Sequence, residues 1–162
     1  NFEGMPDNIL IDEHLDVDLL VNDYFLVKNI LDGFSATQNR YEDGKNRILN
    51  YVIIKNKKVL FDFRSVGDDY FDKNFQQDML DTRIQHENGF YIPNKEMHLY
   101  SLIYHAIIHK PKISSTYLKV FKEYGLGDSE INKTSLRNKL DSWLQKKRYS
   151  YCKPEPSVGY YL

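Results

Sequence analysis

Three stretches in the first half of the chain have the apolar pattern of β-strands. Residues 15–21 read Leu-Asp-Val-Asp-Leu-Leu-Val, and residues 47–54 and 59–63 are rich in β-branched and aromatic side chains. Such stretches are typical of β-strands, in which successive side chains point to opposite faces. The polar segment Lys-Asn-Lys-Lys at 55–58 separates the second stretch from the third. We therefore predict that these two strands form a hairpin.

Apolar residues recur at helical spacing in the segments 23–31, 75–83, 97–109, 114–124 and 135–147. Asp23 is suited to cap the first of these helices, and Pro111 is suited to end the third. The polar segment 35–45 is predicted to be a loop, and the segment 89–93 to be an extended link.

This order of elements predicts an α+β fold, with a mixed β-sheet core followed by a helical C-terminal half. We expect the core to span residues 1–93, a helical substrate-side region to span 94–148, and an extended tail to span 149–162. The chain begins with Asn1 rather than Met, and its strand pattern starts almost at once. We therefore expect a segment of a longer protein, fused to further domains.

Composition narrows the class of partner. The chain has 162 residues and a net charge of −1, which argues against a long nucleic acid, because phosphate backbones are met by clustered positive charge. The one cysteine, Cys152, excludes an internal disulfide and a cysteine zinc cluster, and a single thiol suits the cytoplasm. No run approaches the roughly 20 apolar residues that span a bilayer, so no membrane partner is expected.

The first strand carries two aspartates at alternate positions, Asp16 and Asp18. Their side chains would point to one face, where two carboxylates repel each other. A divalent cation offsets that repulsion, and hard oxygen ligands suit Mg²⁺. The alternative is an edge strand with two solvated aspartates.

A third aspartate, Asp62, stands between Phe61 and Phe63 in a later strand. Asp is depleted in strands and rarely buried without a partner. If this strand lies beside the first, three carboxylates converge. Such a cluster suits one or two Mg²⁺ ions that hold a triphosphate.

An Asp-x-Asp on one strand and a third Asp on a later one resembles the active-site pattern of the nucleotidyltransferase superfamily, the polymerase β-like fold, and its small antibiotic-nucleotidyltransferase-like bacterial members. That family carries a Gly-Ser turn upstream, which holds the triphosphate. At the matching place this chain has Gly4 and Met5, about eleven residues before Asp16, so the glycine is present and the serine is not. The resemblance covers about residues 4 to 110.

The resemblance implies an enzyme that moves a nucleoside monophosphate from an NTP to a hydroxyl of a small acceptor, such as a sugar or sugar phosphate. Asp16 and Asp18 would hold Mg²⁺, and Asp62 would complete the catalytic metal site. Arg64 would share the face of Asp62, where it could neutralise the acids or bind a phosphate. The alternative is a non-catalytic nucleotidyltransferase-like module that serves a larger protein as a binding or scaffolding domain.

The predicted helix 97–109 is nearly apolar all round, which indicates burial. His105 and His109 nevertheless share one of its faces with His98, and Lys110 follows directly. We predict that His105, His109 and Lys110 meet the nucleotide or the acceptor. A structural role for the histidines stays open, as does zinc chelation by the pair at i and i+4, although the chain lacks a His-Glu-x-x-His arrangement.

Two further acids, Asp68 and Asp69, follow the third strand closely. Aspartate favours turns, and a turn is the simplest explanation for both. The alternative is that one of them contacts the acceptor or acts as its base.

Overall fold

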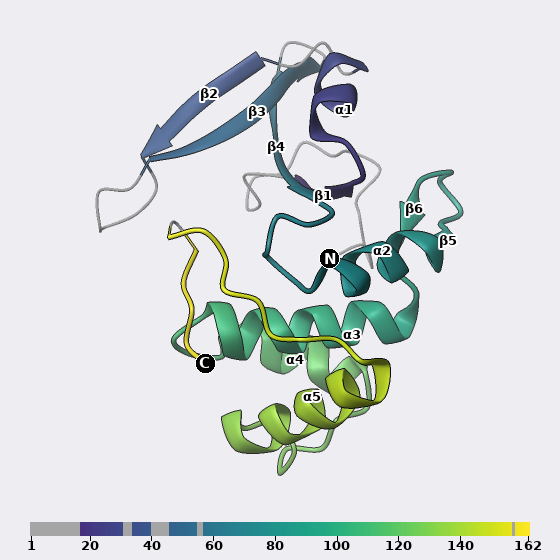
Figure 1. The fold of residues 1–162 in the computed structure, drawn as a ribbon, viewed down its shortest axis with the longest axis vertical. Helices are drawn as coiled ribbons and strands as arrows, with labels where there is room; N and C mark the ends of the chain where they lie inside the picture. Colours follow the sequence, from purple (N-terminus) through teal and green to yellow (C-terminus); the bar gives the residue numbers. More distant parts are fainter. Residues whose placement is uncertain (1–16, 31–33, 40–45, 55–56, 157) are drawn as a thin grey trace. The chain divides into compact units, whose positions relative to one another are not determined.

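The computed structural model describes residues 17–30, 34–39, 46–54, 57–156 and 158–162 (Figure 1). The chain divides into two compact units. We call Asn1–Asp68 the N-terminal unit and Asp69–Leu162 the helical unit, and each is described by itself.

The N-terminal unit is built on a mixed β-sheet. Its described elements are β1 (Val17–Val21), α1 (Tyr24–Ile30), β2 (Phe34–Asn39), β3 (Asn46–Ile54) and β4 (Lys57–Ser65). The strand order is β1-β4-β3-β2, in which β1 runs parallel to β4 and the other neighbours are antiparallel. The predicted mixed sheet and the predicted β3–β4 hairpin are confirmed.

The two faces of strand β4 differ in chemistry. Phe61 and Phe63 stack with their ring centroids 6.0 Å apart, and Tyr24 of α1 packs edge-on against Phe63 at 5.7 Å. Asp62 lies between them in sequence and therefore points to the opposite face. Helix α1 begins at a cap, as predicted, because the Asp23 carboxylate accepts a hydrogen bond from the Leu26 backbone N–H at 3.0 Å. An apolar face packed against α1 thus leaves the acidic face of the strand uncovered by this helix.

Two strand regions were missed by the sequence prediction. The polar segment that we predicted to be a loop contains β2, which pairs with β3 at one edge of the sheet. An edge strand is held by backbone hydrogen bonds on one side only, so it tolerates a polar sequence. Further along the chain, β5 (Ile84–Gln85) and β6 (Tyr91–Ile92) pair as an antiparallel ribbon. Strand β5 directly follows the predicted helix 75–83, and β6 lies in the segment 89–93 that we predicted to be an extended link.

The helical unit contains the helices that the sequence predicts for the second half of the chain. They are α2 (Lys73–Asp81), α3 (Lys95–Tyr104), the π-helix η1 (His105–His109), α4 (Ser115–Glu123) and α5 (Lys133–Lys147). Side-chain oxygens cap three of them: those of Asp72, Asn94 and Asn132 accept from backbone N–H groups of the first turn. The third predicted helix is one continuous segment in which the last turn, η1, is π-helical rather than α-helical.

The core of this unit is aromatic. Phe75 of α2 is fully buried, and its ring lies 5.1 Å from Phe71, 5.0 Å from Trp143 and 5.3 Å from Tyr149. Helix α2 therefore belongs with α5 and the tail. This packing explains why the units divide at residue 68, whereas the sequence placed the end of the core at residue 93.

The described residues of the tail form no helix or strand, and the tail runs along α3 and η1 before a turn in which the Val158 N–H donates to the Glu155 carbonyl (Figure 1). The Tyr104 hydroxyl accepts from the Cys152 backbone N–H at 3.0 Å, and the Tyr149 hydroxyl donates to Asp78 at 2.5 Å. Burial and this carboxylate raise the pKa of Tyr149. Near the C-terminus, the Tyr161 N–H donates to the Ile108 carbonyl at 2.7 Å, which satisfies a carbonyl at the helix end.

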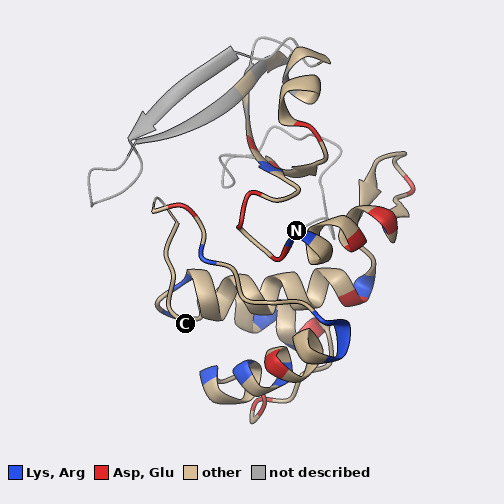
Figure 2. Ribbon diagram, viewed as in Figure 1, with Lys and Arg blue, Asp and Glu red and all other residues tan. Residues whose placement is uncertain are grey.

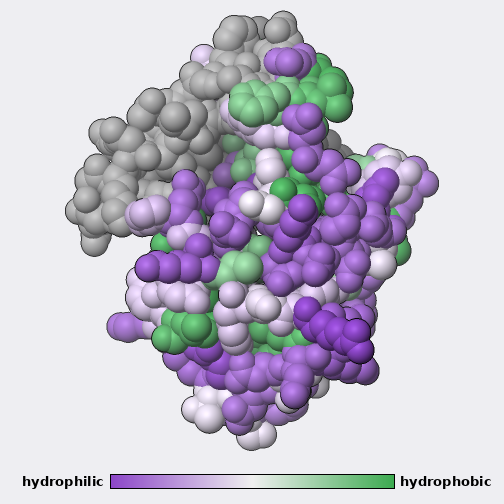
Figure 3. All heavy atoms as spheres, viewed as in Figure 1, coloured by the Kyte–Doolittle hydropathy of each residue, from purple (hydrophilic) through white to green (hydrophobic). Residues whose placement is uncertain are grey.

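The surfaces of the two units carry different groups. Helix α1 exposes Phe25, Leu26 and Ile30, and Figure 3 shows an apolar patch over this helix. Helix α5 instead carries basic residues along its length, which are marked in Figure 2. No helix in the described part of the chain is long and apolar enough to cross a membrane.

Replacing Phe75 with Ala should lower the free energy of unfolding of the helical unit by about 3–5 kcal/mol, because it leaves a cavity among three aromatic rings. The chain's one tryptophan, Trp143, is buried against Phe75, so its fluorescence during urea denaturation reports on this core. Leu118→Ala removes an exposed side chain of α4 and should change stability by no more than about 0.5 kcal/mol. Equal effects of the two substitutions would contradict the assigned core.

Candidate functional site

Two carboxylates stand side by side on neighbouring strands of the N-terminal unit, and one of these strands, β1, lies at the edge of the sheet. Asp18 of β1 is the register partner of Asp62 of β4, and the two strands run parallel. Register partners in a sheet point to the same face. Asp62 is 9% exposed and Asp18 is exposed, so the pair has one anchored member and one that solvent reaches. The structure thus brings together two of the three predicted catalytic aspartates.

A cation of the protein itself lies beside this pair. Arg64 is two residues beyond Asp62 on the same face of β4, and the Nη2 atom of Arg64 is 3.9 Å from Oδ2 of Asp62. Its Nη1 atom is 3.9 Å from Oδ2 of Asp68. Both distances are longer than a charge-assisted hydrogen bond, so these two contacts are ion pairs. They place the positive charge of Arg64 on the acidic face of the strand.

The turn after β4 explains the next two acids. Asp68 accepts a hydrogen bond from the Ser65 backbone N–H at 3.3 Å, and the Asp68 N–H donates to the Ser65 carbonyl at 3.0 Å. Asp69 has a φ of 61°, a conformation that Asp adopts more readily than most residues. Turn formation therefore accounts for both residues, and Asp68 also faces Arg64.

The donor set of the acidic pair fits a hard cation. Carboxylate oxygens are the ligands that Mg²⁺ uses in proteins, usually one or two of them together with water and substrate phosphate. Among the residues that the structure describes, no group of three or more His, Cys, Asp or Glu side chains lies within reach of one metal ion. Asp16, Gly4 and Met5 lie outside the described residues, so their predicted roles stay predictions.

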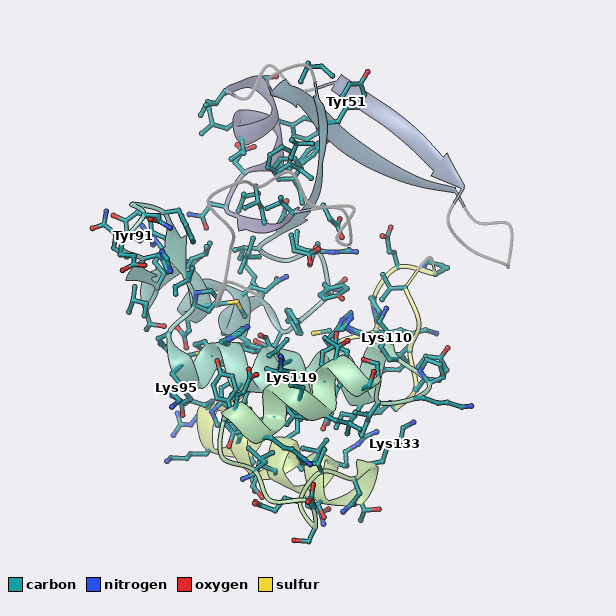
Figure 4. The ribbon with its side chains drawn as sticks, turned by 180° about the vertical axis from the view of Figure 1, so that it is seen from behind. Tyr51, Tyr91, Lys95, Lys110, Lys119 and Lys133 are labelled. Atoms are coloured by element: carbon teal, nitrogen blue, oxygen red, sulfur yellow. The ribbon has the colours of Figure 1, made fainter. Side chains whose placement is uncertain are left out.

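The predicted stripe of histidines separates into two places in the helical unit. His98 pairs with the Tyr124 hydroxyl, whereas the rings of His105 and His109 lie 5.4 Å apart. His109 is only 3% exposed, while Lys110 is exposed and begins an extended segment after η1 (Figure 4). Of this stripe, Lys110 is the residue that offers its charge to a soluble ligand, and contact with a nucleotide stays a prediction.

Sequence reasoning missed Tyr70, whose hydroxyl lies 2.5 Å from Nδ1 of His105. Tyr70 precedes α2 by three positions and stands 35 residues away from its partner. A local pattern carries no signal for such a pair, because the contact depends on how the turn before α2 meets η1.

Comparisons with protein-family models, with curated proteins and with solved structures found no match for this chain.

The stability of the helical unit should fall as the pH is lowered from about 6.5 to about 4. Burial lowers the pKa of His98 from its ordinary value of 6.5 to about 4. In this window the unfolded chain therefore binds a proton that the folded chain does not, which favours unfolding. Urea denaturation followed through Trp143 fluorescence at a series of pH values measures the slope.

His98→Gln removes the titrating group, so it should flatten that slope. The matched control His86→Gln changes a histidine of the β5–β6 turn and should keep the slope. If the His98 variant kept the full slope, other groups would carry the acid sensitivity.

Proposed function

We propose that this chain is an Mg²⁺-dependent nucleotidyltransferase with a polymerase β-like core, which moves a nucleoside monophosphate from an NTP to a hydroxyl of a small acceptor. One observation carries the proposal: Asp18 and Asp62 are register partners on parallel strands, with Arg64 beside them. Aspartates on neighbouring strands of a mixed sheet are the arrangement that the sequence resemblance implies. The expected location of such an enzyme is the cytoplasm.

Each described residue of the site has a distinct role in this proposal. Asp18 and Asp62, together with Asp16, would hold the metal through carboxylate oxygens. Bound Mg²⁺ supplies neutralisation of the triphosphate charge and of the leaving pyrophosphate. Arg64 would donate hydrogen bonds to a phosphate oxygen, and Asp62, the more buried acid, would help to take the proton of the acceptor hydroxyl.

The cost of burying charge supports this proposal. A buried carboxylate next to a second carboxylate is unfavourable, and Arg64, with Nη2 3.9 Å from Asp62, is one cation that offsets this cost. A domain that only serves as a scaffold gains nothing from this arrangement. An NTP-bound cation would remove the repulsion and so link substrate binding to the stability of the site.

Asp62→Asn should abolish most Mg²⁺-dependent NTP binding, weakening it by roughly 10-fold to 100-fold, because one charged ligand is lost from a nearly isosteric side chain. Calorimetric titration of each NTP, with and without Mg²⁺, measures the change. Asp81→Asn removes the same charge from the exposed end of α2 and should leave NTP binding unchanged. Unchanged binding in the Asp62 variant would remove the nucleotidyltransferase assignment.

Turnover distinguishes the enzyme from a non-catalytic module. Pyrophosphate release should be measured with each NTP against sugars, sugar phosphates, aminoglycosides and protein hydroxyls. Release that depends on both Mg²⁺ and one acceptor class supports the enzyme, whereas Mg²⁺-dependent NTP binding without release supports a binding module.

Arg64→Gln should have opposite effects on two ligands. Mg²⁺ alone should bind about tenfold more tightly, because the guanidinium no longer competes for Asp62. Mg²⁺–NTP should bind about tenfold more weakly, because a phosphate contact is lost. Calorimetry on the intact chain measures both, and Arg83→Gln, which removes a guanidinium stacked on Tyr91, is the control. Parallel changes for the two ligands would contradict the role assigned to Arg64.

A further inference from the structure

The last turn of the long helix has an uncommon backbone. Residues His105–His109 form the π-helix η1, and the turn begins and ends with a histidine. Turns of this kind are rare and are found often at functional sites, because the wider spacing rearranges the side chains of one face. The two imidazoles are brought to one place by this turn and are joined there by Tyr70 from the segment before α2. We call these three residues the His–Tyr cluster.

Three ligating atoms converge in the His–Tyr cluster. Nδ1 of His105 is 3.3 Å from Nδ1 of His109 and 2.5 Å from the Tyr70 hydroxyl oxygen. A neutral imidazole nitrogen has either one proton or one lone pair, so Nδ1 of His105 cannot serve both neighbours well. Nδ1 of His105 thus lies close to both a second imidazole nitrogen and a phenol oxygen, which brings three atoms that can bind a metal to one place.

The spacing of the nitrogens matches a metal centre. Two nitrogens bound to zinc at about 2.0–2.1 Å, with tetrahedral angles, stand about 3.3 Å apart. We propose that His105 and His109, through Nδ1, and Tyr70, through its phenolate oxygen, bind a divalent transition-metal ion of the zinc class, with water as the fourth ligand. The nitrogen pair needs no change of separation to do so.

Tyr70 must adjust more than the histidines. A tetrahedral site would place the phenolate oxygen about 3.2 Å from Nδ1 of His105, so Tyr70 would move outward by about 0.7 Å. Tyr70 lies in a bend outside the helices, where such a shift disturbs no helical hydrogen bond. On binding, the phenol proton and any proton on a ligating Nδ1 leave to solvent, so metal uptake releases protons and strengthens as the pH rises. The remaining imidazole proton of His109 then lies on its buried Nε2.

The surroundings hold the cluster and exclude water from one side. The His109 ring lies 4.2 Å from that of Tyr70, 5.2 Å from Tyr104 and 5.9 Å from Phe71. The tail passes close to the backbone of η1. A Cβ at Gly159 would come within 2.7 Å of the His109 carbonyl oxygen, so only glycine fits at this position. A site with preset ligands loses little entropy when the ion enters.

Imidazole and phenolate ligands bind Mg²⁺, the cation proposed for the acidic pair, only weakly. Nitrogen donors suit zinc, copper and nickel, whereas Mg²⁺ prefers carboxylates, phosphates and water. Saturating Mg²⁺ should therefore occupy the aspartates without displacing zinc from the His–Tyr cluster. This difference separates a failure of this proposal from a failure of the proposed nucleotidyltransferase activity.

The test is a calorimetric titration of Zn²⁺ into the intact, tag-free chain in excess Mg²⁺. We expect one ion per chain, with release of protons. His105→Gln should weaken zinc binding by roughly 100-fold and Tyr70→Phe by roughly tenfold. Removing a residue that only supports a metal ligand already weakens binding by about 10-fold to 100-fold. His86→Gln and Tyr91→Phe, which change the same residue types in the β5–β6 ribbon, should bind zinc like the unmodified chain.

Absorption spectroscopy distinguishes Tyr70 as a metal ligand from Tyr70 as a residue that only packs in the core. Cu²⁺ bound to a phenolate gives a visible charge-transfer band, which should be present in the unmodified chain and absent from Tyr70→Phe, whose ring still packs on His109. Zinc binding that is absent, or that is equal in His105→Gln, Tyr70→Phe and the unmodified chain, overturns the proposal. So does a copper complex without the phenolate band.

Discussion

The parallel register between β1 and β4 is the constraint on which the candidate site depends. It pairs Val17 with Phe61 and Leu19 with Phe63 on one face, and Asp18 with Asp62 on the other. A slip of one residue would turn every side chain of β1 to the wrong face. Phe61 and Phe63 stack on each other and Tyr24 packs against Phe63, so a slip that moved the apolar residues of β1 off this face would lose apolar contacts. The apolar face therefore sets the register, and the two carboxylates are held together as its consequence.

The helical unit uses aromatic residues in a second way, since many of its rings carry a polar end. Tyr104 and Tyr149 contribute large surfaces to the core, while their hydroxyls bond to the tail and to Asp78. A buried hydroxyl must find a partner, so each of these tyrosines fixes an element in place as well as filling space. The same property brings Tyr70 to His105.

The elements that the sequence predicted well are those whose cause is local. Asp23 caps α1, the apolar spacing marks the helices, and β3 and β4 pair as an antiparallel hairpin. Strand β2 was missed because its pairing with β3, rather than its own residues, makes it a strand. The π-turn and the packing of α2 depend on contacts between residues far apart in the chain, such as Phe75 with Trp143, which no periodicity encodes. The pairing of Asp18 with Asp62 could be expected, because each aspartate stands between apolar residues of its own strand. The contact of Tyr70 with His105 could not be expected, because no local pattern marks it.

The two clusters of ligating side chains differ in a way that bears on which cations the chain would hold. The acidic pair offers hard carboxylate oxygens, and Arg64 places a positive charge beside them. The His–Tyr cluster is neutral until the phenol loses its proton, and its nitrogens are of intermediate softness. An ion that prefers one cluster therefore gains little from the other. Because the clusters belong to different units, each set of ligands follows from the packing of its own core.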